Sequence, residues 1–133
     1  MTLGYRNNNP GNLRPSGDAW QGMIGTEGGF MKFASMVWGV RAAIKNFKTW
    51  YGRGQTTLRM FITTYAPSSE NDTENYINFI SRNTKIDPDK KFTFDYETVK
   101  KILYYMFLLE SQYQMPLNVF DDAWALATGE KKK

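Results

Sequence analysis

The segment YYMFLLESQYQMPLN, residues 104–118, carries an apolar stripe that ends in a carboxylate. Glu110 follows Met106 by four residues and Leu103 by seven, and both spacings return to one face of a helix. A carboxyl group among apolar side chains favours its protonated form, which a general acid needs. The spacing therefore indicates either a general acid in a cleft or a helix-end Glu that reaches solvent or pairs with Arg or Lys.

Apolar residues at steps of three and four predict further helices on the N-terminal side of this segment. One runs from Ser35 as N-cap to Gly52, a second spans about 57–65, and a third starts at 72 or 73. Asp95 caps the helix that carries Glu110, and a last short helix is predicted over 121–127. Two short segments flank the Gly-rich residues 25–29, and this arrangement predicts a β-hairpin within 20–33. We therefore expect a mainly α, helical globule with one small hairpin near the N-terminus and the Glu-bearing helix near the C-terminus.

The composition limits the possible chemistry. The chain has 133 residues, 41% of them hydrophobic, which predicts one folded domain, 1–133. It has no His and no Cys, so Ser-His-Asp triads, Cys-His pairs and the usual zinc ligand sets are excluded. We expect no metal and no cofactor. Any catalysis would have to be carried out by carboxylates, Tyr, Lys or Ser.

Charge and hydropathy limit the possible partners. The net charge is +4, and three of the basic residues are the terminal Lys131, Lys132 and Lys133. Residues 129–133 are expected to form a flexible basic tail, and the body is only weakly basic, so no nucleic-acid partner is expected. There is no run of about 18 apolar residues and no signal-peptide pattern at the N-terminus. Another component would have to deliver the protein if its target lies outside the cytoplasm. A monomer is expected.

Two other acidic residues are candidates for a second catalytic carboxylate. Glu27 lies in the expected hairpin turn, where an exposed turn residue is the simpler interpretation. Glu70 precedes a helix, where a negative charge commonly stabilises the helix N-terminus.

Residues 6–14, RNNNPGNLR, concentrate amides and guanidinium groups that can bind sugar hydroxyl and acetamido groups. Asn8, Asn9, Asn12 and Arg14 are therefore candidate substrate-binding residues. Trp20, between this loop and the hairpin, is a candidate stacking platform.

These segments resemble a family of small phage muralytic proteins of the lysozyme-like superfamily. The resemblance covers about residues 5–118 through RNNNPGNLR, WQG, GGFMKF, WGVRAAIKNFKTWYGRG and APSSENDTENYINFI. LLESQYQMPLN is also similar to the E-S-x-aromatic end of the catalytic helix in goose-type lysozymes and lytic transglycosylases, although Gln112 stands where Gly is common. NPGNLR and TTYAPSSENDT are similar to segments that follow that helix in flagellar-type glucosaminidases, which implies a circular permutation.

The resemblance implies an enzyme that cleaves the glycan strand of bacterial peptidoglycan, as a lytic transglycosylase or a muramidase, with Glu110 as general acid/base. It implies that Tyr65 contacts the sugar or the acid, that Tyr65 and Glu70 lie at one cleft, and that the Asn-rich segment packs beside Glu110. It also implies synthesis in the host cytoplasm and delivery to the periplasm or cell wall by a phage particle or lysis machinery. Alternatives are a peptidoglycan endopeptidase and a non-catalytic virion structural protein with a lysozyme-like fold.

Overall fold

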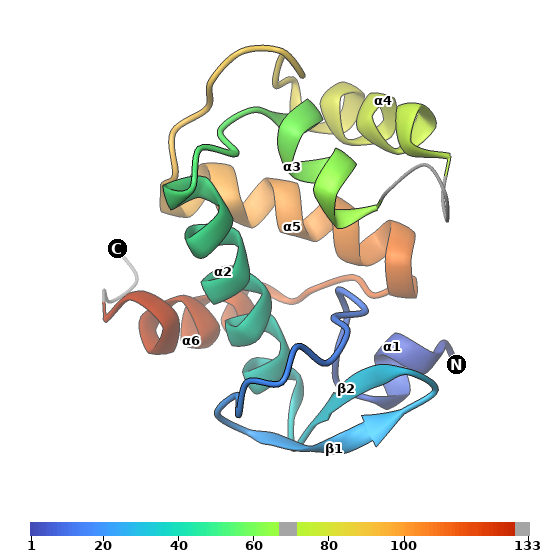
Figure 1. Cartoon of the computed structure of the whole chain (residues 1–133). Helices are drawn as coiled ribbons and strands as arrows, with labels where there is room; N and C mark the ends of the chain where they lie inside the picture. The colour runs from blue at the N-terminus through green and yellow to red at the C-terminus, as the bar shows by residue number, and fades with distance from the viewer. Residues whose placement is uncertain (67–71, 130–133) are drawn as a thin grey trace. The chain divides into compact units, whose positions relative to one another are not determined.

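The computed structural model describes residues 1–66 and 72–129, which form two compact units. The first unit contains residues 1–46 and 106–129, and the second contains residues 47–66 and 72–105. The elements, labelled in Figure 1, are α1 (Leu3–Arg6), β1 (Met23–Glu27), β2 (Phe30–Phe33), α2 (Met36–Gly52), α3 (Leu58–Tyr65), α4 (Thr73–Thr84), α5 (Tyr96–Ser111) and α6 (Leu117–Thr128). The expected mainly α fold with one hairpin near the N-terminus is confirmed.

The hairpin of the first unit depends on two glycines. Glu27 pairs with Phe30, which leaves Gly28 and Gly29 as a two-residue loop with φ angles of 64° and 87°. Residues other than glycine rarely adopt two successive positive φ angles, so this turn favours Gly-Gly. The register shifts between Met23 and Gly25, where a bulge interrupts the antiparallel pairing. Figure 1 shows the two strands side by side as the expected hairpin.

Large apolar side chains are buried in both units. In the first unit Phe33, Ile44, Phe107 and Phe120 are fully buried. In the second unit the rings of Phe47 and Phe61 stack with centroids 4.2 Å apart, and Ile62, Ile80 and Ile102 are fully buried. Burying each such side chain stabilises a fold by roughly 1.5–3 kcal/mol.

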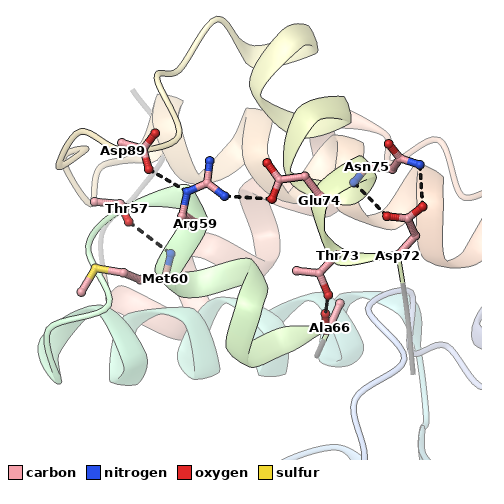
Figure 2. A network of polar contacts seen from close by, with 9 residues as sticks. All are labelled: Thr57, Arg59, Met60, Ala66, Asp72, Thr73, Glu74, Asn75 and Asp89. Atoms are coloured by element: carbon pink, nitrogen blue, oxygen red, sulfur yellow. Dashed lines mark hydrogen bonds and ion pairs between the residues drawn. The ribbon is translucent and has the colours of Figure 1, made fainter. Parts of the chain in front are cut away.

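Polar contacts fix the ends of the helices in the second unit (Figure 2). Thr57 accepts a hydrogen bond from the Met60 backbone N–H at the start of α3, and Asp72 accepts one from the Asn75 N–H at the start of α4. The Arg59 guanidinium on α3 binds Glu74 of α4 at 2.9 Å and Asp89 at 2.7 Å. These contacts join α3 to α4 and to the turn that follows α4.

Two elements differ from the sequence prediction. Helix α1 was not expected, because four residues are too short to show an apolar stripe. Helix α6 begins at Leu117 rather than near residue 121, directly after Pro116, whose φ of −66° suits a helix start. Leu117, the first residue of α6, is 51% exposed, whereas Phe120, three residues further on, is fully buried.

Within residues 1–66 and 72–129, no helix combines the length and the apolar character needed to cross a membrane.

Candidate functional site

The Asn-rich loop, residues 7–14, is ordered by its own side chains. Asn9 is fully buried, and its side-chain amide donates to the backbone oxygens of Leu13 and Met31, both at 2.9 Å. Its Oδ1 accepts from the Leu13 N–H at 2.9 Å. A buried amide is tolerated when it is hydrogen-bonded in this way. Asn9 was predicted to bind substrate, but in this structure its amide is engaged inside the protein and offers nothing to a sugar.

Asn7 and Asn8 attach the same loop to the hairpin. The Asn8 amide donates to the Phe33 oxygen at 3.0 Å, and the Phe33 N–H donates to the Asn7 oxygen at 2.8 Å. Asn7, also fully buried, donates to the backbone oxygen of Glu27 at 3.2 Å. Asn8 has a φ of 53°, a left-handed conformation that Asn tolerates better than most residues. The Asn8 side chain, predicted to bind substrate, therefore serves as a link between loop and strand.

Two glycines allow the chain to approach this loop closely. A Cβ atom at Gly39, on α2, would overlap the backbone oxygen of Asn8. A Cβ atom at Gly4, on α1, would overlap Ser111 Oγ and lie 2.7 Å from Asn12 Oδ1. Both glycines are buried, so any side chain there would separate segments that now touch. Glycine at position 4 thus permits contact between α1, the Asn-rich loop and the end of α5.

The end of α5 is held by the N-terminal segment. Ser111 is 1% exposed, and its hydroxyl donates to the Pro10 oxygen at 2.8 Å. The Ser111 backbone oxygen accepts from the Thr2 hydroxyl at 2.7 Å. The last carbonyls of a helix have no partner within the helix, so this bond satisfies one of them. Neither Thr2 nor Ser111 was predicted as a site residue, although Ser111 belongs to the E-S-x-aromatic segment.

The two hydrogen bonds of Ser111, to Thr2 and Pro10, are called the clamp below. Glu110 lies one residue before this clamp, at a half-buried position. The Asn12 side-chain amide donates to Glu110 Oε1 at 3.1 Å and to the Glu110 backbone oxygen at 3.2 Å. The prediction that the Asn-rich loop packs beside Glu110 is confirmed for Asn12. The contact joins residues 98 positions apart, and it places an amide donor directly on the candidate acid.

Glu27, the candidate second carboxylate, lies at the end of β1 in the same unit. Its Oε1 is 3.2 Å from Lys32 Nζ, and its Oε2 pairs with the Arg6 guanidinium. The hydrogen bond from Lys32, and then that from Arg6, hold the pKa of Glu27 below its usual value. Glu27 is therefore ionised at neutral pH and is not a proton donor there.

Gln112 and Tyr113, which follow Ser111, complete the E-S-x-aromatic segment. Gln112 has a φ of 54°, a left-handed conformation that ends α5. Gly adopts such a conformation more readily than Gln does. Tyr113 packs edge-on against Tyr5 with ring centroids 5.6 Å apart, and burial raises its pKa to about 12.

The remaining candidates occupy other environments. The Arg14 guanidinium lies 4.8 Å from the centre of the Phe30 ring, in cation–π contact. Trp20 is half-buried, and its indole N–H has no hydrogen-bond partner among the residues that the structure describes. Tyr65, in the second unit, packs against Trp50 and Phe61 with centroids 6.1 and 5.8 Å apart. Glu70 lies outside the described residues, so its predicted place beside Tyr65 stays a prediction.

No cluster of three or more acidic side chains that would suit a metal ion occurs within the described ranges 1–66 and 72–129. The chemistry that this arrangement supports is proton transfer by a carboxyl group that accepts a hydrogen bond from an amide.

Comparison with known proteins connects the chain to a bacteriophage. No family model matches the sequence. The chain is 36% identical over 94 residues to "Protein P5" of Pseudoalteromonas phage PM2. The match covers 66% of this chain and 59% of the phage protein, so the chain spans less than two thirds of that protein's length. The chain is therefore similar to a phage protein.

Proposed function

We propose that this protein cleaves the β-1,4 glycan strand of bacterial peptidoglycan and that Glu110 is its general acid/base. The observation that carries the proposal is the contact between Asn12 of the Asn-rich loop and Glu110 of the E-S-x-aromatic segment. Both segments belong to the resemblance to muralytic and lysozyme-like proteins, and they meet although they lie 98 positions apart in the sequence. The similarity to a phage protein supports a role in phage entry or lysis.

In the proposed reaction Glu110 donates its proton to the glycosidic oxygen while the bond from that oxygen to the sugar C1 breaks. The Glu110 carboxylate then removes the proton from the 6-hydroxyl of the same sugar, and the 6-oxygen bonds to C1. The product carries a 1,6-anhydro end, and Glu110 is again protonated. This is the lytic transglycosylase outcome, which needs one carboxylate rather than two.

The surroundings of Glu27 favour this outcome over hydrolysis. A retaining hydrolase needs a second carboxylate that can attack C1, and an inverting hydrolase needs one that activates water. Both Glu27 oxygens are engaged by cations, Oε1 by Lys32 and Oε2 by Arg6. An oxygen held in this way is a poor nucleophile and a poor base, so we assign Glu27 to stabilising the hairpin.

The test is digestion of purified peptidoglycan, with the released fragments identified by mass. Anhydro muropeptides are the expected product. Reducing ends would instead indicate a muramidase, and free peptides an endopeptidase. Wild-type protein that releases nothing would contradict the enzymatic role and favour the virion structural alternative.

A pair of variants on one helix tests the assignment of Glu110. Glu110→Gln keeps the shape and cannot donate a proton, so fragment release should fall by at least about 10²-fold, with an unchanged thermal midpoint. Glu97→Gln is the matched control, because Glu97 is an exposed residue of α5 that pairs only with Lys100 among the described contacts. Equal activity in both variants would remove Glu110 from the mechanism.

The proposed route is synthesis in the host cytoplasm followed by delivery with the phage particle or through the lysis machinery. Mass spectrometry of purified particles and of infected-cell fractions distinguishes the two. Sedimentation of the purified protein tests the expected monomer.

A further inference from the structure

The amide of Asn12 occupies a more specific position than a general sugar-binding group would need. Its side-chain nitrogen donates to both Glu110 Oε1 and the Glu110 backbone oxygen, at 3.1 and 3.2 Å. The same side chain therefore fixes the carboxyl group relative to its own backbone. Asn12 holds a φ of 52°, a conformation that favours Asn over most other residues.

We propose that Asn12 is a positioning residue that directs the acid proton of Glu110 to Oε2. The inference rests on the proposed function of Glu110. In a protonated carboxyl group one oxygen carries the hydrogen and the other is the stronger acceptor. An N–H donor directed at Oε1 favours the form in which Oε1 accepts and Oε2 bears the proton. The donor also limits rotation of the carboxyl group, so the proton is presented in one direction.

The scaffold around Asn12 supports this role. Its backbone N–H donates to the Asn9 oxygen at 3.0 Å, and Asn9 is itself fixed by three side-chain hydrogen bonds. Ser111, which follows Glu110, binds the Pro10 oxygen at 2.8 Å. The Ser111–Pro10 contact thus holds the loop and the end of α5 together beside the Asn12–Glu110 bond. A group that places a reacting side chain needs such support, because small displacements cost much of the rate.

The geometry separates positioning from direct binding of substrate. Asn12 Oδ1 is buried, and within residues 1–66 and 72–129 it accepts no hydrogen bond. It lies against Gly4, where even a Cβ atom would be 2.7 Å away. A sugar hydroxyl has no access to that oxygen, and the amide nitrogen already contacts Glu110. The sequence-based prediction of Asn12 as a binding residue is therefore replaced by a role that acts through Glu110.

Asn8 provides a matched control within the same loop. Asn8 and Asn12 have φ angles of 53° and 52°, and each donates its side-chain amide to a neighbouring segment. Replacing either with Gly relieves the same backbone conformation and removes one amide. Of these two residues, Asn12 contacts Glu110 and Asn8 contacts Phe33, so the two variants differ in the property under test.

The experiment measures kcat and KM of Asn12→Gly, Asn8→Gly and the wild-type protein on soluble, uncross-linked glycan strands. We expect Asn12→Gly to lower kcat by about 10- to 10²-fold, with KM within about twofold of wild type, because the carboxyl group is misplaced while the binding surface is kept. Asn8→Gly should keep kcat within about twofold. Asn12→Asp, which keeps the side-chain shape and tolerates the same φ but lacks the donor, should lose kcat at least as strongly.

Each outcome decides the inference. Active wild-type protein together with wild-type kcat in Asn12→Asp, or equal kcat in the two glycine variants, would overturn the positioning role and leave the proposed function standing. A rise in KM at unchanged kcat would also overturn it, in favour of substrate binding. Wild-type protein without glycan-cleaving activity would overturn the proposed function, and the role of Asn12 with it.

Discussion

Gly4→Ala is expected to destabilise the protein, although the usual effect of this substitution in a helix is the opposite. Gly4 lies in α1 and does not have a positive φ, so its backbone conformation suits Ala. In an ordinary helix the exchange would stabilise by roughly 0.5–1 kcal/mol. Here the added Cβ would overlap Ser111 Oγ and lie 2.9 Å from the Asn9 oxygen.

The loss of stability expected for Gly4→Ala can be estimated from the contacts of the added Cβ atom. Forcing a methyl group into a packed region costs about 1–3 kcal/mol. Displacing Ser111 also weakens its bond to Pro10, which adds about 1 kcal/mol. Subtracting the helix-propensity gain leaves a net loss of about 1–3 kcal/mol. For a chain of this size the thermal midpoint should fall by about 4–12 °C.

Thermal unfolding followed by circular dichroism measures the effect. The control is Gly52→Ala at the end of α2, where a Cβ atom would meet nothing within 4 Å. Gly52→Ala should unfold at or slightly above the wild-type midpoint. A Gly4→Ala variant that is as stable as Gly52→Ala would refute the close packing of α1, the Asn-rich loop and the end of α5.

Gln112→Gly should raise stability by about 0.5 kcal/mol, because the relief of a left-handed conformation exceeds the entropy that Gly loses on folding. Gln114→Gly, a nearby exposed control without a positive φ, should lower it, and equal changes in chemical denaturation would contradict the argument. Glu27→Gln tests the ion pairs: because Lys32 and Arg6 lower the pKa of Glu27, their stabilisation is present above its usual value of 4.5 and is lost as pH falls through the lower folded pKa. The midpoints of wild type and Glu27→Gln should therefore differ at pH 7 and approach each other as the pH falls below 4.5, and a difference that does not shrink in acid would count against ion pairing.

The sequence predicted the helices whose signals are local. Helices α3 and α4 lie where the sequence predicted them, with Thr57 and Asp72 as their N-caps, and the apolar stripes agree with the buried faces. The pattern failed where an element is too short to have a stripe, as in helix α1. Such elements are stabilised by neighbouring segments rather than by local propensity.

The sequence could predict which residues gather at the candidate site, but not which partner each side chain binds. The sequence placed three Asn residues in one group, and only the structure shows that Asn8 and Asn9 bind backbone oxygens while Asn12 contacts Glu110. An amide side chain has the same donors and acceptors in each case, so its partner depends on which segments meet. The close approach at Gly4 and Gly39 had no signal in a single sequence, because a glycine in a helix shows nothing about its neighbours.

The clamp at the end of α5 has a consequence for the order in which the protein is made. Thr2 and Ser111 are 109 positions apart, so the N-terminal segment leaves the ribosome long before its partner exists. At about 5–20 residues per second, the Asn-rich loop waits roughly 5–20 s for α5 to be synthesised. A nascent chain that stops before residue 110 contains the Asn-rich loop but lacks Glu110. A chain that stops there would therefore lack the activity proposed for Glu110.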